Sequence, residues 1–228
     1  MDYVIAPPAV PSLPVQGSPQ RFPIRRIFCI GRNYAEHAKE MGATIEPGRP
    51  MFFCKPADGV VADGGDVPYP SVTHDFHHEV EMVLALGAGG ANVPAERAAA
   101  LVWGVGVGLD LTRRDLQAQA KAKGHPWDAA KAFDHCAPIS ALRRIDGALP
   151  PAATVLSLSV NGAERQRVQL GAMLHDVPHI LAALSELFEL HAGDLVFTGT
   201  PSGVAPLVRG DRYHAELAGY ATLDGRIV

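Results

Sequence analysis

The sequence predicts an α+β fold in which strands dominate. Three observations support this prediction: most apolar runs have the length of strands, the helical segments are short, and strands and helices do not alternate regularly along the chain. The 228 residues are 47% hydrophobic and 19% charged, which is the composition of a soluble globular protein with a sizeable core.

The N-terminal part of the chain is predicted to be an arm that precedes the globular domain. Residues 1–22 contain five prolines and show little periodicity, which favours an extended segment lying over the domain or over a neighbouring molecule. The globular domain is therefore expected over residues 23–228. Two short apolar runs, residues 25–30 and residues 51–55, are predicted to be its first strands.

Between these strands, residues 33–41 are predicted to form a short helix, with Asn33 as its N-cap and Gly42 after its end. His37 and Glu40 are three residues apart, so their side chains lie on one face of this helix. Such a pair is either an ordinary exposed ion pair or a histidine base that a carboxylate orients. The pattern alone leaves both interpretations open.

An acidic segment begins the strand predicted at residues 77–86. Side chains alternate between the two faces of a strand, so Glu79 and Glu81 share one face. Two carboxylates at the head of an apolar run are costly unless a positive charge neutralises them, and a bound cation is one explanation. The alternative is that both carboxylates pair with Arg113 or Arg114 at the surface.

Glycines mark the strand predicted at residues 102–112. Gly104, Gly106 and Gly108 fall on one face, which indicates that another backbone packs closely there. Asp110 lies on the same face and is the first side chain of that face that can do chemistry. A polar helix is predicted to follow at residues 113–123, capped by Thr112.

The other predicted elements follow from periodicity and turn residues. They are helices at residues 94–102 and 177–190, a loop or strand segment at 131–134, a hairpin of strands 154–161 and 164–169 with an Asn161-Gly162 turn, a strand entering a glycine loop at 193–201, and strand–turn units over the last 30 residues.

Composition excludes several classes of function. The net charge is −4 and there is no basic block, so nucleic acid is not expected as a partner. The three cysteines show no CxxC spacing, which argues against a disulfide framework and a structural zinc site; they are interpreted as buried apolar residues in a reducing cytoplasm. No apolar run approaches the roughly 20 residues of a membrane span, so no membrane partner is expected. The N-terminus lacks the features of a signal peptide, so a cytoplasmic location is expected.

Seven motifs occur along the chain in a fixed order. They are Gly31-Arg32-Asn33-Tyr34, Phe53-Cys54-Lys55-Pro56, His77-x-Glu79-x-Glu81, Gly108-Leu109-Asp110-Leu111-Thr112-Arg113-Arg114-Asp115, Gly124-x-Pro126-Trp127, Lys131-x-Phe133-Asp134 and Thr198-Gly199-Thr200-Pro201. With this combination the chain resembles the fumarylacetoacetate hydrolase family over residues 22–228. Within the family, the pattern is most similar to the small acylpyruvate hydrolases.

The resemblance implies a fold, a cofactor and an assembly. The implied fold has rolled mixed β-sheets around a barrel-like core with short peripheral helices, and the implied assembly is a homodimer. The implied cofactor is Mg²⁺ or Mn²⁺, held by Glu79, Glu81 and Asp110. Three carboxylates form a hard oxygen site, which suits these ions, or Ca²⁺ in crystals, better than zinc. A zinc site built on His74 and its neighbours is disfavoured, and His77 is expected instead to support the ligands by hydrogen bonding.

The implied reaction is hydrolysis of the C–C bond of 2,4-dioxo acids (acylpyruvates). Fumarylpyruvate is the expected substrate, cleaved to fumarate and pyruvate in aromatic degradation of the gentisate type. An alternative is oxaloacetate decarboxylation or keto–enol tautomerisation at the same metal-enolate site. A non-enzymatic metal-binding protein would leave the seven polar motifs unexplained.

The resemblance also assigns roles to individual residues. His37 is the implied general base, which Glu40 orients, and Lys131 contacts the substrate or the attacking water. The expected substrate-binding residues are Lys55, Arg114, Gln117, Gly199 and Thr200. Simpler interpretations stay open for several of them: Lys131 as a surface lysine, Arg114 as a brace for Asp115, and the Thr-Gly-Thr-Pro loop as a plain turn.

Overall fold

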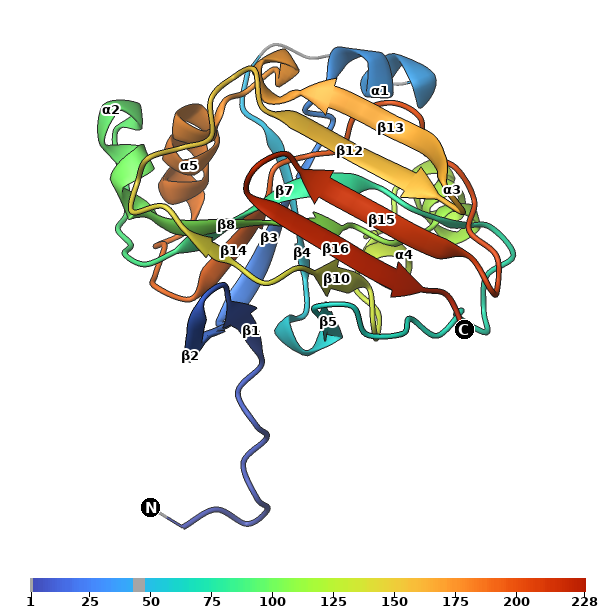
Figure 1. Ribbon diagram of the computed structural model, residues 1–228, viewed down its shortest axis with the longest axis horizontal. Helices are drawn as coiled ribbons and strands as arrows, with labels where there is room; N and C mark the ends of the chain where they lie inside the picture. Colours follow the sequence, from blue (N-terminus) through green and yellow to red (C-terminus); the bar gives the residue numbers. More distant parts are fainter. Residues whose placement is uncertain (1, 43–47) are drawn as a thin grey trace.

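Two β-sheets form the body of the molecule, as the computed structural model shows for residues 2–42 and 48–228 (Figure 1). The larger sheet has eight strands, in the order β4-β3-β14-β7-β8-β10-β5, with β11 beside β8. Their bounds are β3 (Arg26–Gly31), β4 (Met51–Lys55), β5 (Val60–Ala62), β7 (Val80–Leu86), β8 (Val102–Leu109), β10 (Ala137–Ile139), β11 (Arg143–Arg144) and β14 (Asp194–Phe197).

The smaller sheet has four strands in the order β13-β12-β15-β16. They are β12 (Val155–Val160), β13 (Ala163–Gln169), β15 (Arg212–Leu217) and β16 (Ala221–Arg226). Strand β12 contacts β7, and β15 and β16 contact β8, so this sheet covers one face of the two central strands (Figure 1). The core therefore lies between two sheets, and the prediction of a mostly β fold with short helices is confirmed.

The central strands β7 and β8 are buried almost throughout because both of their faces are covered. Gly104 and Gly108 allow neighbouring chain to approach: a Cβ at Gly104 would lie 2.8 Å from the Arg143 carbonyl oxygen, and one at Gly108 would lie 3.0 Å from that of Pro138. The close approach predicted from the alternating glycines is thus confirmed.

Four strands of the larger sheet bring their ends to one edge. Strand β14 pairs with β3 in parallel and with β7 antiparallel, and β7 pairs with β8 antiparallel. The carboxyl ends of β3, β14 and β8 therefore lie beside the start of β7. The segments that follow β3, β14 and β8 all leave the sheet at this edge, which we call the site edge.

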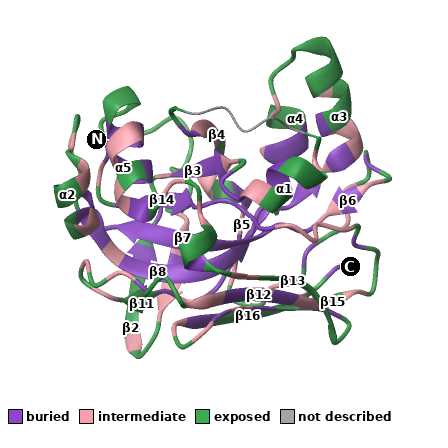
Figure 2. Ribbon diagram, turned by 90° about the horizontal axis from the view of Figure 1, so that it is seen from above, coloured by how far each residue is buried: buried purple, intermediate pink, exposed green. Residues whose placement is uncertain are grey.

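Helices lie at the two ends of the sheets (Figure 2). At one end, α5 (Val177–Leu187) packs on α2 (Ala95–Ala98); at the other lie α1 (Ala35–Glu40), α3 (Arg114–Lys123) and α4 (Asp128–Lys131). Asp176 caps α5 by accepting the His179 N–H at 3.0 Å. Three short 3₁₀ helices complete the set: η1 (Ala57–Gly59), η2 (Ala99–Leu101) and η3 (Leu170–Ala172). None of the helices in the described residues has the length and apolar character needed to cross a membrane.

The N-terminal segment is more structured than the proline content predicts. Strands β1 (Ser12–Val15) and β2 (Ser18–Pro23) form an antiparallel hairpin, and only the residues before it are extended and exposed. Leu13 and Phe22 point into the core, with 0% and 8% of their surface exposed. A two-stranded ribbon has only edge strands, which tolerate proline, and the burial of these two side chains stabilises it.

Several local predictions were wrong. The acidic strand is interrupted, since β6 (Phe76–His77) ends before Glu79 and β7 begins after it, and β6 pairs instead with β9 (Thr112–Arg113). Lys131 ends helix α4 (Asp128–Lys131), which was not predicted, whereas residues 132–134 form the expected loop. Asn33 and Thr112 do not cap helices, because their side chains bond to carbonyl oxygens elsewhere. Of the cysteines, Cys54 is exposed.

Candidate active site

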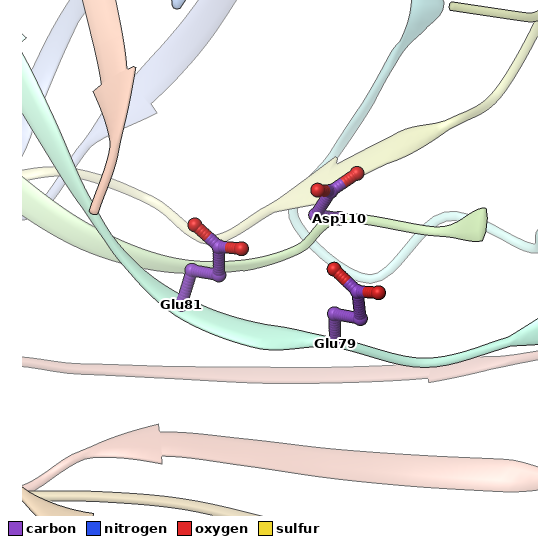
Figure 3. Close-up of side chains that lie close together, drawn as sticks. All are labelled: Glu79, Glu81 and Asp110. Atoms are coloured by element: carbon purple, nitrogen blue, oxygen red, sulfur yellow. The ribbon is translucent and has the colours of Figure 1, made fainter. Parts of the chain in front are cut away.

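Three carboxylates from the central strands converge at the site edge (Figure 3). Glu79 precedes β7, Glu81 lies within it and Asp110 follows β8. The pairing of β7 with β8 continues beyond the strands, since the Asp110 N–H donates to the Glu79 carbonyl at 2.8 Å. One oxygen from each carboxylate lies within 4.8 Å of the others, and all three side chains are buried. Antiparallel pairing thus brings together the residues predicted to hold a metal.

Two of the carboxylates are neutralised by cations of this chain. Lys131 Nζ lies 2.8 Å from Glu79 Oε2 and 2.7 Å from Asp110 Oδ2, and Arg114 Nη2 lies 2.5 Å from Glu79 Oε1. Burial would raise the pKa of Glu79, but Lys131 and then Arg114 outweigh it and hold this pKa well below its usual range. Of the alternative in which both glutamates pair with Arg113 or Arg114 at the surface, only the Glu79–Arg114 pair occurs, and it lies inside a buried cluster.

Glu81 has no such partner. Within the described part of the chain, its carboxylate forms no ion pair, and the hydrogen bond it accepts comes from the Gly199 N–H at 2.6 Å. Burial, then the charges of Asp110 and Glu79, hold the pKa of Glu81 well above its usual range. A buried carboxylate beside two others is costly in its charged form, so this residue favours a further positive charge in the cluster.

Lys55 supports Asp110 from the side away from the cleft described below. Its ammonium lies 2.8 Å from Asp110 Oδ1, and it donates to the carbonyls of Lys131 at 2.5 Å and Leu111 at 3.1 Å. Its side chain is fully buried and does not line the cleft, where it was expected to bind substrate. Asp110 is thus ion-paired with Lys55 at one oxygen and with Lys131 at the other.

The residues present fit a divalent cation. The cluster offers only carboxylate oxygens, and Glu81 has no cationic partner among the described residues. In the residues that the structure describes, no histidine or cysteine belongs to a group of this kind. His77 does not support the carboxylates as expected, since its Nε2 pairs with Asp75 at 2.7 Å.

The cluster opens into a cleft with about 440 Å³ of free space, part of it open to solvent. Eight of the eleven predicted site residues line it: His37, Glu79, Glu81, Asp110, Arg114, Gln117, Lys131 and Thr200. Arg114 Nη1 donates to Gln117 Oε1 at 2.7 Å, so these two side chains are held together at the start of α3. The other three, Glu40, Lys55 and Gly199, do not line the cleft but contact residues that do.

The His37–Glu40 pair lies at the rim of this cleft. His37 is buried, and its Nδ1 is 3.2 Å from Glu40 Oε2. The other oxygen of Glu40 accepts the Gly203 N–H at 3.1 Å. The pair therefore bridges helix α1 and the loop after β14, and it is not the free exposed ion pair that the simpler interpretation describes.

Gln166, which no sequence pattern singled out, ties the carboxylate segment to the Thr-Gly-Thr-Pro loop. Its Oε1 accepts the Val80 N–H at 3.0 Å and lies 2.9 Å from His78 Nδ1. Its Nε2 donates to Thr200 Oγ1 and to the Pro201 carbonyl, both at 2.9 Å. Burial lowers the pKa of His78 to about 4, so this histidine is neutral in the network at neutral pH.

Comparisons with known proteins agree on the fold and differ on the reaction. The family model described as "Fumarylacetoacetate (FAA) hydrolase C-terminal" matches residues 26–228. A fumarylpyruvate hydrolase from Pseudomonas aeruginosa, solved in complex with Mn²⁺ and pyruvate, is 46% identical and superposes with a TM-score of 0.96 over 100% of this chain and 99% of its own.

Two relatives are named for reactions of oxaloacetate. The oxaloacetate tautomerase YcgM of Escherichia coli (strain K12) is 39% identical over 207 residues, covering 90% of this chain and 94% of its own. The mitochondrial oxaloacetate decarboxylase of Dictyostelium discoideum is 39% identical over 199 residues, covering 87% of this chain and 91% of its own.

Proposed function

Because this chain belongs to the fumarylacetoacetate hydrolase family, we propose that it is a metal-dependent hydrolase of acylpyruvates, with fumarylpyruvate as its substrate and fumarate and pyruvate as its products. One observation carries the proposal: His37, which Glu40 contacts, and the three-carboxylate cluster line the same cleft. Hydrolysis of a C–C bond needs both a base for water and a means to stabilise the carbanion equivalent that departs.

Glu79, Glu81 and Asp110 are the proposed ligands of Mg²⁺ or Mn²⁺, and the Mn²⁺ in the Pseudomonas aeruginosa relative supports this choice. When bound, the cation supplies positive charge that stabilises the negative charge developing on the departing pyruvate enolate. Lys131 and Arg114 contact the same carboxylates and line the cleft, so they are the proposed cationic contacts for oxygens of a bound dioxo acid. Gln117 and Thr200 complete the polar lining of the cleft.

His37 is the proposed base. With its Nδ1–H donated to Glu40, Nε2 is the nitrogen that accepts a proton from water. The oxygen of that water adds to C4 of the dioxo acid, and the C3–C4 bond then breaks. Its electron pair passes into the enolate of pyruvate, which takes up a proton at C3. The Glu40 carboxylate stabilises the imidazolium formed in between.

Oxaloacetate tautomerisation or decarboxylation is the second candidate, which the two relatives named for these reactions favour. Both reactions pass through an enolate of a 2-oxo acid and require no attacking water. The same carboxylate cluster therefore serves either reaction, and the role of His37 separates them.

A substrate panel tests the proposal. Purified protein with Mn²⁺ is assayed against fumarylpyruvate, acetylpyruvate and oxaloacetate, following the enol absorbance and the pyruvate released. We expect acylpyruvate cleavage with one pyruvate per substrate, lost on His37→Gln by at least about 100-fold, the lower range of a general base. Turnover of oxaloacetate alone, unaffected by His37→Gln, would establish the second candidate instead.

The proposal extends to assembly and location, with the enzyme as a cytoplasmic homodimer in aromatic catabolism. Light scattering after size-exclusion chromatography tests the assembly, because the chain mass is 24.2 kDa and a dimer has twice that mass. Elution at the monomer mass across micromolar concentrations contradicts it.

A further inference from the structure

Two cations that line the cleft have no role in the proposed chemistry. Arg32 follows β3, and Lys121 lies on α3. Neither forms an ion pair with any residue in the described ranges, whereas Lys131, Arg114 and Lys55 are all paired with carboxylates. Arg32 and Lys121 therefore present positive charge to the cleft.

Both cations line the same cleft, and both side chains are exposed. Burial, then the charges of Arg114 and Arg32, lowers the pKa of Lys121. Two cations that share a cleft and have no carboxylate partner among the described residues attract an anion to it.

Aromatic side chains connect this cation pair with the carboxylate cluster. Lys131 Nζ lies 5.2 Å from the centroid of the Phe53 ring, the Phe53 and Trp127 rings are 6.1 Å apart, and Lys121 Nζ lies 5.2 Å from the Trp127 ring. All four side chains line the cleft. Two aromatic rings, tilted 57° to each other, therefore line the cleft between Lys131, which contacts the carboxylate cluster, and Lys121.

We propose that Arg32 and Lys121 bind a second carboxylate, at the far end of the acyl group, while Phe53 and Trp127 contact a planar acyl chain. The preferred substrates are then acylpyruvates whose acyl group is an unsaturated dicarboxylic acid. This inference rests on the proposed hydrolysis of fumarylpyruvate and assigns the residues that select its acyl group. Short uncharged acyl groups leave the two cations without an anion.

The test compares two substrates that differ at the acyl end. Fumarylpyruvate carries the second carboxylate and acetylpyruvate does not, so the ratio of their kcat/KM values isolates its contribution. A hydrogen bond to a charged group corresponds to about 10- to 100-fold in this ratio. We expect Lys121→Met and Arg32→Gln each to lower the ratio by about that factor, in the enzyme with Mn²⁺ bound.

Lys123→Met is the matched control, because Lys123 lies on the same helix, is exposed and does not line the cleft. It should leave the ratio unchanged. A ratio that stays constant in Lys121→Met and Arg32→Gln overturns the inference, as does an equal loss on both substrates.

Fumarate binding separates this inference from the proposed reaction. Quenching of tryptophan fluorescence by fumarate, measured without turnover, should weaken at least about tenfold in Lys121→Met and not in Lys123→Met. If the parent enzyme cleaves no acylpyruvate but binds fumarate through Lys121, the reaction proposed above is wrong and the carboxylate site stands. Absence of fumarate binding by the parent enzyme overturns the carboxylate site.

Discussion

Replacing Gln166 by leucine removes the side chain that joins two parts of the site. Gln166 is 1% exposed and bonds to the Val80 N–H, the Pro201 carbonyl, Thr200 and His78. Leucine has a similar volume, so the change tests the hydrogen bonds and creates no large cavity. An unsatisfied buried polar group costs about 1–3 kcal/mol, and at least the two backbone groups lose their partner.

The expected loss of unfolding free energy is therefore about 3–5 kcal/mol, part of which the added apolar burial offsets. For a chain of 228 residues this corresponds to a fall in Tm of about 10 °C. Val80 stands between Glu79 and Glu81, so Mn²⁺ affinity should fall as well. Circular dichroism measures the first effect and titration calorimetry with Mn²⁺ the second.

Gln169→Leu provides the control, since Gln169 is on the same strand and exposed. Its effect should stay within about 0.5 kcal/mol, as for an ordinary surface substitution. Equal Tm values for Gln166→Leu and Gln169→Leu would refute the reasoning. So would a Gln166→Leu variant with lowered Tm and unchanged Mn²⁺ affinity, at least for the link to the carboxylates.

Three further predictions concern the cation, a buried ion pair and the response to acid. Mn²⁺ at 100 times its Kd should add about 2.7 kcal/mol to the unfolding free energy and raise Tm by about 5–10 °C. This Tm shift should be lost in Glu81→Gln and retained in the exposed control Glu96→Gln. A full Tm shift in Glu81→Gln contradicts the proposed metal site. Lys55→Met should cost about 3–5 kcal/mol in urea unfolding, because it leaves Lys131, which also pairs with Glu79, as the one ion-pair partner of Asp110 among the described residues and leaves two buried carbonyls without their donor. A loss below about 1 kcal/mol would show that the pair is not structural. Partial burial raises the pKa of Asp115, but hydrogen bonds from a threonine hydroxyl and backbone N–H groups outweigh it and lower this pKa. A lowered carboxyl pKa stabilises the fold above the unfolded pKa of about 3.9, so in urea titrations the stability difference between the parent and Asp115→Asn should be constant from about pH 5 to pH 8 and shrink below about pH 4. A stability difference that grows in acid contradicts this sign.

Much of the fold could be predicted from local pattern because strands carry their own signals. The Asn161-Gly162 turn, with φ of 52° and 79°, connects β12 and β13 as its sequence indicates. The alternating glycines of β8 predicted close backbone approach for a steric reason that needs no knowledge of the partner. Glu79 and Glu81 could be paired from the alternation of a strand, which is a local signal, whereas Asp110 was grouped with them through the family resemblance.

The rest depends on contacts between distant residues. Gln166 lies among exposed polar side chains on β13 and looks like any of them in sequence, while its partner His78 is 88 positions away. Asn33 has the residue type of a helix cap, yet its amide donates to the Thr198 carbonyl at 2.8 Å, and this tertiary bond prevailed over the local one. Nothing in the sequence shows from which side Lys55 approaches Asp110, so its position outside the cleft could not be predicted.

At the site edge, the carboxylates proposed to hold the cation and the segments that surround them come from different strands. The carboxylates belong to the antiparallel pair β7–β8, whereas α1 and the Thr-Gly-Thr-Pro loop follow the parallel pair β3 and β14. Residues of these two segments that do not contact the carboxylate segment, unlike Gly199 and Thr200, can be replaced without altering the strands that carry the carboxylates. A lineage built this way acquires new substrates by changing the loops around a constant centre. Relatives of similar sequence that are named for tautomerisation, decarboxylation and C–C hydrolysis are the expected outcome of that freedom.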